Sequence, residues 1–150
     1  MRTKTIDHFL RATWQAVSKM YNEEASRYGA TMATGLTLLS IDTEEGVPST
    51  SLGPRMGMES TSLSRTLKTM ENQGLIRREP NPQDGRSVLI RLTKEGLEKR
   101  SLSREVVMHF NQVIEESVSP EELESFYKVI KLILQKVQER SIFIPQKQVS

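Results

Sequence analysis

MESTSLSRTLKTMENQGLIRREPNPQDGRSVLIRLTKEG, residues 58–96, is the stretch that decides the fold. In its first part, three apolar residues recur at helical spacing: Leu63, Leu67 and Met70. Gly74 then provides a stop, because only glycine adopts a positive φ without strain. The stretch therefore predicts a helix over about residues 60–73.

Two β-like runs follow this helix, at residues 75–79 and 87–92. The segment between them contains Pro82 and Gly85, two residue types that favour turns. A helix that leads directly into a two-stranded hairpin is the arrangement found in the second half of a winged helix-turn-helix. The hairpin would be the wing.

The flanking sequence is mostly helical. Apolar periodicity predicts further helices over about residues 7–28, 31–43, 50–56, 94–117 and from 120 to at least 137. Thr93 is placed to cap the fifth predicted helix, and Ser119 with Glu122 forms a capping box before the last one. Pro54 falls inside the short helix and removes a backbone hydrogen bond, so that helix is expected to begin late or to be kinked. The predicted fold class is mainly α (α+β).

The composition limits the possible functions. The chain has 150 residues, of which 27% are charged and 36% hydrophobic, as in one soluble domain, and no apolar run is long enough to cross a bilayer. It has no cysteine, and its two histidines, His8 and His109, lie in no cluster of metal ligands. The polar N-terminus does not resemble a signal peptide. We therefore expect a cytoplasmic protein without a metal or other cofactor.

The charge is unevenly distributed along the chain. Residues 55–104 hold eleven Lys/Arg and six Asp/Glu, a net of +5, whereas the segments on either side are slightly acidic. Such a basic middle is typical of a segment that faces a polyanion. The alternative interpretation is a solvated surface, and charge alone does not separate the two.

The predicted helix at 60–73 has a polar face opposite its apolar stripe. This face carries Thr61, Arg65, Lys68 and Asn72, with Ser62 and Ser64 beside them. Hydroxyl, guanidinium, ammonium and amide groups bond base edges and phosphates. After a tight glycine turn, such a helix is a candidate reader of the DNA major groove. The alternative is an ordinary solvated helix surface.

The hairpin offers a second set of candidate contacts. Asp84 and Arg86 lie two residues apart, so the carboxylate is expected to accept from the guanidinium and hold it extended toward the minor groove. Arg77 and Arg78, at the base of the hairpin, are expected to meet phosphates. The alternative is a functionally silent surface ion pair worth about 0–1 kcal/mol.

These residues resemble the MarR-type winged helix-turn-helix transcriptional regulators. The resemblance is carried by Leu63, Ser64, Arg65, Gly74, Leu75, Arg78, Asp84, Gly85, Arg86, Leu92, Thr93 and Gly96. It implies a single MarR-type domain over 1–150, with a DNA-binding lobe at 30–100. It further implies a sequence-specific regulator, a ligand-responsive repressor that binds a palindromic operator in double-stranded DNA as a homodimer.

The terminal helices favour a dimer on their own account. The first, fifth and last predicted helices carry more apolar surface than a small winged core can cover, and Ile142, Phe143 and Ile144 add to it. A symmetric dimer formed through residues 1–28 and 101–144 would bury this surface.

A small aromatic or anionic effector is also implied by the resemblance, bound between the dimer helices and the DNA-binding lobe. Trp14, Tyr21 and Tyr28 are candidates to line its pocket. Alternatively, these aromatic residues belong to the core. Because the chain has no cysteine, a switch based on thiol oxidation is closed to it.

Two other classes of function are alternatives for this sequence. One is a winged-helix module whose basic face meets an acidic protein partner. The other is an enzyme, for which the sequence offers no nucleophile–base pair, phosphate-binding loop or metal constellation. We therefore expect a DNA-binding transcriptional regulator and no enzyme.

Overall fold

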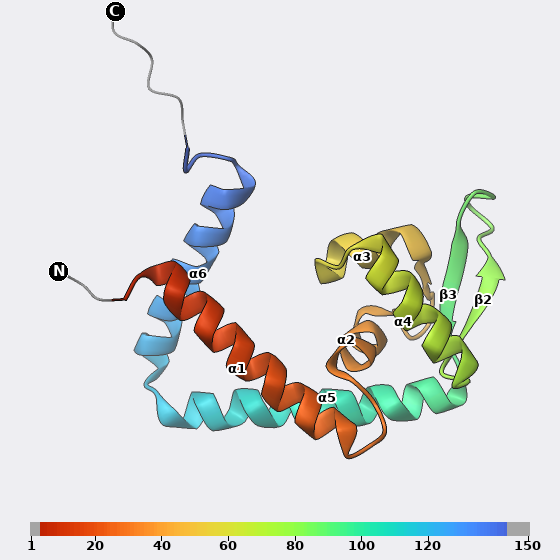
Figure 1. The fold of residues 1–150 in the computed structure, drawn as a ribbon, viewed down its shortest axis with the longest axis horizontal. Helices are drawn as coiled ribbons and strands as arrows, with labels where there is room; N and C mark the ends of the chain where they lie inside the picture. Colours follow the sequence, from red (N-terminus) through yellow and green to blue (C-terminus); the bar gives the residue numbers. More distant parts are fainter. Residues whose placement is uncertain (1–3, 144–150) are drawn as a thin grey trace, which may run out of the picture. The chain divides into compact units, whose positions relative to one another are not determined.

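The computed structural model of the chain describes residues 4–143 (Figure 1). Its elements follow in the order α1 (Ile6–Ser26), α2 (Met32–Ser40), β1 (Val47–Pro48), α3 (Ser49–Met56), α4 (Ser60–Asn72), β2 (Ile76–Pro80), β3 (Val88–Leu92), α5 (Lys94–Ser117) and α6 (Pro120–Gln138). The chain divides into two compact units, Met1–Val107 and Met108–Ser150, with the boundary inside α5. The mainly helical fold with a small wing is confirmed.

The core of the first unit lies where α2, α3 and α4 meet the sheet. Its buried members are Leu38, Ile41, Val47, Leu52, Leu63, Leu67, Met70, Leu75, Ile76, Ile90 and Leu92. The stripe predicted on α4 is thus confirmed, because all three of its apolar residues are buried. Full burial of a side chain of this size contributes about 1.5–3 kcal/mol, which fixes the orientation of α4 and leaves its polar face outside.

The sheet has one more strand than the sequence predicted. Its order is β1-β3-β2, with both pairs antiparallel, and Val47 of β1 lies opposite Ile90 of β3. Gly46 precedes β1 with a φ of +71°, and a Cβ there would lie 2.6 Å from the carbonyl oxygen of Ile90. Only glycine permits this close approach, so it allows the chain between α2 and α3 to join the wing.

The ends of the helices lie close to the predicted positions, with two differences. Gly57 and Gly74 take φ values of +62° and +74°, as a left-handed stop requires. However, α2 ends at Ser40, earlier than predicted, because Asp42 Oδ1 accepts from two backbone N–H groups of the following turn. Of the two alternatives expected for α3, the late start is wrong, because the helix begins at Ser49, directly after β1, and contains Pro54; the kink stays a prediction.

The wing is joined to α5 through Thr93. Its N–H donates to the carbonyl oxygen of Leu75 at 3.0 Å, and its hydroxyl donates to that of Gly74 at 2.5 Å. The same hydroxyl accepts from the N–H of Gly96 at 3.1 Å, which confirms Thr93 as the cap of α5. The end of α4, the start of β2 and the start of α5 therefore share one hydrogen-bonded junction.

The second unit contains the end of α5 and all of α6. The capping box is confirmed: Glu122 N–H donates to Ser119 Oγ at 3.1 Å, and Ser119 N–H donates to Glu122 Oε2 at 2.9 Å. Much of the apolar stripe of α6 is exposed, including Phe126, Val129, Leu134 and Val137. Ile142 and Phe143 are exposed as well, whereas Ile144 lies outside the described residues. None of the helices described at 4–143 has the length and apolar character of a membrane span.

Candidate nucleic-acid interface

The polar face of α4 is fully presented to solvent. Because the opposite stripe is buried, the side chains predicted to contact DNA are all exposed: Thr61, Ser62, Ser64, Arg65, Lys68 and Asn72. The first turn of the helix contains no acidic residue, although Glu59 stands at the N-cap position. The helix thus offers hydroxyls near its N-terminus and two cations in its middle.

Arg65 and Lys68 are the cations that α4 leaves available. Among the salt bridges within 4.0 Å in the described part of the chain, none involves either side chain, and none involves Arg86 at the wing tip. An exposed cation without a carboxylate partner breaks no ion pair when it meets a phosphate, and it releases counterions there. These three side chains are therefore the best placed for a polyanion.

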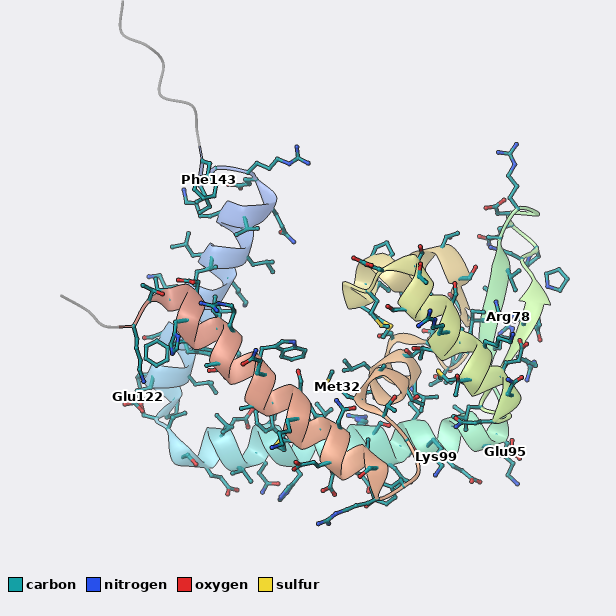
Figure 2. The ribbon with its side chains drawn as sticks, viewed as in Figure 1. Met32, Arg78, Glu95, Lys99, Glu122 and Phe143 are labelled. Carbon is teal, nitrogen blue, oxygen red and sulfur yellow. The ribbon has the colours of Figure 1, made fainter. Side chains whose placement is uncertain are left out.

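The arginines at the base of the wing are held differently. Arg77 Nε donates to Glu79 Oε1 at 2.8 Å, and Arg78 Nε donates to Glu71 Oε2 at 2.8 Å. Figure 2 labels Arg78 on β2. The sequence predicts phosphate contacts for both arginines but does not reveal these carboxylate partners. Since such partly exposed pairs are worth only about 0–1 kcal/mol, each carboxylate competes with DNA without excluding it.

Glu79 lies between two arginines. Besides Arg77, it accepts from Arg91 Nε at 2.6 Å, and Arg91 also donates to the carbonyl oxygen of Glu44 at 2.7 Å. These contacts hold the pKa of the Glu79 carboxyl below its ordinary value, with the hydrogen bond from Arg77 as the largest cause. Alternation along β2 could have revealed the Arg77–Glu79 pair, because side chains two apart share one face of a strand.

The tip of the wing is shaped by short polar side chains. Asp84 Oδ1 accepts from the backbone N–H of Arg86 at 3.0 Å, and Asn81 Nδ2 donates to Ser87 Oγ at 2.9 Å. The expected ion pair between Asp84 and the Arg86 guanidinium is absent from the described contacts, so that prediction is wrong. The carboxylate is used to close the turn, because the backbone N–H lies nearer to it. Arg86 is left exposed and unpaired.

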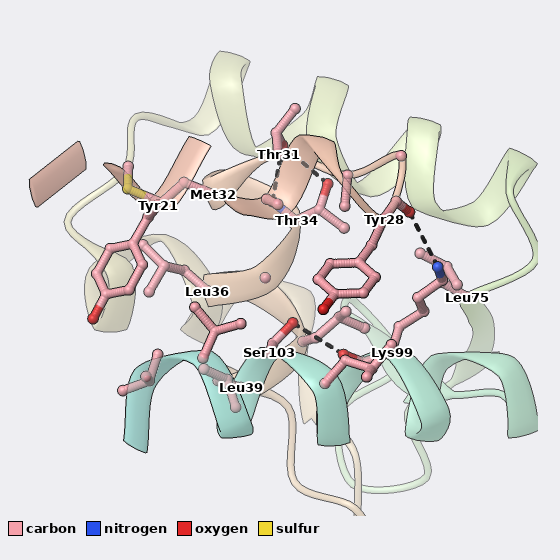
Figure 3. A pocket seen from close by; sticks show the side chains of 18 of the residues that line it. Tyr21, Tyr28, Thr31, Met32, Thr34, Leu36, Leu39, Leu75, Lys99 and Ser103 are labelled. Carbon is pink, nitrogen blue, oxygen red and sulfur yellow. Dashed lines mark hydrogen bonds between the residues drawn. The ribbon is translucent and has the colours of Figure 1, made fainter. Parts of the chain in front are cut away.

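A cavity of about 240 Å³ lies apart from this surface, among α1, α2 and α5 of the first unit (Figure 3). Of the three aromatic residues considered for a pocket, Tyr21 and Tyr28 line it, whereas Trp14 does not and is 56% exposed. Lys99 and Ser103, which α5 contributes to the same wall, were not predictable from a local sequence pattern. No group of His, Asp and Glu within residues 4–143 is arranged to hold a metal ion.

Comparison with known proteins identifies relatives of both the sequence and the fold. Residues 30–88 match the MarR family. The chain is 34% identical, over 58% of its length, to the organic hydroperoxide resistance transcriptional regulator of Bacillus subtilis (strain 168). The match spans 59% of that relative, which is less than two thirds of its length.

Solved structures share the fold over nearly their whole length. The S. aureus MepR–DNA complex superposes with a TM-score of 0.82 and 19% identity, over 89% of this chain and 98% of MepR. The PcaV regulator of Streptomyces coelicolor in complex with its natural ligand gives 0.75 and 24%, over 91% of this chain and 99% of PcaV. At these identities the likeness concerns the fold.

Proposed function

Because the chain belongs to the MarR family of winged helix-turn-helix transcriptional regulators, we propose that it binds a palindromic operator in double-stranded DNA as a homodimer. In this proposal it is a ligand-responsive repressor that works in the cytoplasm. The whole chain forms one MarR-type domain, with its DNA-binding lobe at residues 30–100.

One observation carries the DNA-binding part of the proposal. The face of α4 with two cations free of carboxylate partners is backed by three buried apolar residues, so it is rigidly aimed outward. Rigid presentation favours base readout, because side chains then reach the groove at a fixed depth. The proposed contacts are Thr61, Ser62, Ser64, Arg65 and Lys68 on α4, Arg77 and Arg78 at the base of the wing, and Arg86 at its tip, where Asp84 shapes the turn.

The fold supports this assignment through a relative. MepR, which superposes over 98% of its length, was solved bound to DNA. In this fold the second helix of the helix-turn-helix enters the major groove, and the wing lies over the flanking backbone or minor groove. The corresponding elements here are α4 and the hairpin of β2 and β3.

Exposed apolar side chains support the dimer. On α1, Ile6, Phe9 and Trp14 are 64%, 56% and 56% exposed. On α6, Phe126 and Val137 are 55% and 58% exposed. Helices with so many exposed large apolar side chains are uncommon on monomers, and an isologous interface formed through residues 1–28 and 101–144 would remove these side chains from water. Light scattering after size exclusion tests this, and a monomer at micromolar concentration would overturn it.

A ligand response is supported by the cavity lined by Tyr21 and Tyr28. PcaV, with the same fold, was solved with its natural ligand. A ligand lowers or raises the affinity for DNA only to the extent that it binds one conformation of the protein more tightly than another. The cavity contacts α2, the end of α4 and α5, so its occupancy bears on the elements that position α4.

The decisive experiment is selection of bound duplexes from a random DNA pool by the full chain. Anisotropy titration of the selected duplex and of a scrambled control, at several salt concentrations, then separates readout from charge. We expect a palindrome that binds about a thousandfold or more tighter than the control. Equal, steeply salt-dependent affinity for both duplexes would overturn the proposal and favour an acidic protein partner for the basic face.

A further inference from the structure

We propose that Arg91 is a positioning residue for DNA binding: it holds the Glu79 carboxylate on one face of the wing, so that Arg77 can exchange this carboxylate for a phosphate. Arg91 itself touches no DNA. The inference deepens the proposed function and rests on it, because it explains how an arginine that already has a carboxylate partner serves as a phosphate contact.

The three side chains lie on one face of the hairpin formed by β2 and β3, which run side by side in Figure 1. Arg77 and Arg91 are directly opposite each other in this antiparallel pair, an unfavourable position for two like charges. Glu79, two residues from Arg77, relieves the repulsion by accepting from both. Arg77 Nε donates to Oε1 at 2.8 Å, and Arg91 Nε donates to Oε2 at 2.6 Å. Each arginine uses its own oxygen, so one contact can break while the other stays.

Arg91 is the more firmly held of the two arginines. Its Nη1 also donates to the carbonyl oxygen of Glu44 at 2.7 Å, in the turn before β1. Its stem lies close to Gly46, where a Cβ would come within 3.0 Å of Arg91 Cγ. The Arg91 side chain is 30% exposed, against 56% for Arg77. Withdrawal of Arg91 would therefore break two hydrogen bonds at once.

Arg77 is the exchangeable member. Its hydrogen bond is the largest cause of the lowered pKa of the Glu79 carboxyl, so the two groups are paired in the free protein. The Arg77 side chain nevertheless donates to no other group in the described part of the chain, and water screens a pair that is so exposed. A phosphate offers an equivalent acceptor and releases counterions when it is bound.

The charge that Arg77 leaves behind decides whether this exchange is favourable. With Arg91 in place, Glu79 remains in an ion pair after Arg77 moves to a phosphate. Without Arg91, the exchange would leave an unpaired carboxylate beside a polyanion, and like charges at an interface oppose binding. Arg78 lacks such support, because the Glu71 carboxylate accepts from Arg78 alone in the described contacts. Arg91 thus makes Arg77 the more available arginine at the base of the wing.

A double-mutant cycle tests this role. Arg91→Met keeps an unbranched stem but removes the charge, and it is made in the wild type and in Glu79→Gln, where no carboxylate remains to hold Arg77. Anisotropy titrations at several salt concentrations give the affinity for the selected and the scrambled duplex. In the wild type, Arg91→Met should weaken binding of both duplexes at least about threefold and reduce the salt dependence by about one phosphate contact. Thermal melting verifies that each variant folds.

The Glu79→Gln background separates positioning from a structural or a purely electrostatic role. There, Arg91→Met should weaken binding no more than Arg104→Met, the loss of an exposed arginine on α5. Equal losses in the two backgrounds, or no loss in either, would overturn the proposal. Equal affinity of the wild type for the two duplexes would overturn the proposed operator and leave this inference standing, because phosphate contacts carry no sequence information.

A second measurement needs no variant. In the NMR spectrum of the free protein, the Nε–H of Arg91 should exchange with water at least about threefold more slowly than that of Arg77. Addition of duplex DNA should shift the Arg77 signal and leave the Arg91 signal in place. Exchange at Arg77 as slow as at Arg91, or a shift of the Arg91 signal alone, would overturn the proposal.

Discussion

Arg78 Nε donates to Glu71 Oε2 at 2.8 Å, and this contact ties the last turn of α4 to the first strand of the wing. The two side chains are 37% and 43% exposed, so solvent screens the pair. Its contribution to stability is therefore small, about 0–1 kcal/mol. Its larger effect is on Arg78 itself, which is held by a carboxylate where a phosphate is proposed to bind.

Glu71→Gln is expected to strengthen DNA binding. The change frees Arg78 and removes one negative charge beside the proposed interface, so affinity should rise for all sequences and the salt dependence should steepen by about one phosphate contact. Glu98→Gln, the same change at an exposed position on α5, serves as the control. Anisotropy titrations at several salt concentrations give both quantities. An affinity below that of the wild type would mean that the pair is needed to position α4.

Arg65→Ala is expected to relax sequence preference. If Arg65 reads a base from the middle of α4, the selected duplex should lose about 1–3 kcal/mol of binding free energy while the scrambled duplex changes little. Arg104→Ala, on an exposed part of α5, is the matched control. Equal losses on both duplexes would instead make Arg65 a phosphate contact.

Arg86→Ala is expected to weaken operator binding without loss of fold. Asp84 closes the wing turn through the backbone N–H of Arg86, which the alanine variant retains. Affinity should therefore fall at physiological salt while the thermal midpoint stays within about 1 °C of the wild type. Gln83→Ala at the same tip is the control. Unchanged affinity would remove the wing tip from the interface.

Gly96→Ala is expected to destabilise the protein, against the usual effect of alanine in a helix. Alanine commonly gains about 1 kcal/mol over glycine there. At Gly96, however, a Cβ would overlap the carbonyl oxygen of Leu75. We expect a loss of about 1–3 kcal/mol in the free energy of unfolding, measured with urea. At Gly85 a Cβ meets nothing within 4 Å, so Gly85→Ala is the control. A neutral result at Gly96 would contradict the close packing of α5 on this carbonyl.

The carboxylate of Glu79 is expected to make stability depend on acid pH. Its pKa is lowered from 4.5 by hydrogen bonds from Arg77 and then Arg91. A lowered folded pKa stabilises the protein above the unfolded pKa, and this contribution is lost as pH falls through the folded pKa. The thermal midpoint should therefore drop more steeply below about pH 4.5 in the wild type than in Glu79→Gln. Glu98→Gln should retain the steep drop, and parallel curves for all three proteins would contradict the assignment.

Local signals made much of the fold predictable. Gly57 and Gly74 stop α3 and α4 because each takes a positive φ that other residues avoid. The capping box of Ser119 and Glu122 placed the start of α6 at the right residue. In these cases the residues that determine a helix end lie within four residues of it, so the sequence alone predicts where the helix ends.

Contacts distant in the chain were not predictable. β1 has only two residues, too few to show the alternation of apolar and polar residues that identifies a strand. It is a strand because Val47 pairs with Ile90 of β3. The site shows the same limit: Arg78 reaches Glu71 on another element, and Lys99 finds a carbonyl 71 residues away. The spacing of Asp84 and Arg86 correctly predicted a contact between them. It did not reveal that the carboxylate accepts from the backbone N–H of Arg86 and not from its guanidinium.

β2 has a further consequence as one of the two outer strands of the sheet. An outer strand is a template on which a second copy can extend the sheet, and proteins commonly prevent this with charged side chains and proline. The sequence of β2, Ile-Arg-Arg-Glu-Pro, has both devices. Arg77, Arg78 and Pro80 therefore place charge and a missing N–H donor along this edge. A variant that neutralises both arginines, made to test their proposed phosphate contacts, would also remove charge from this edge and favour edge-to-edge association.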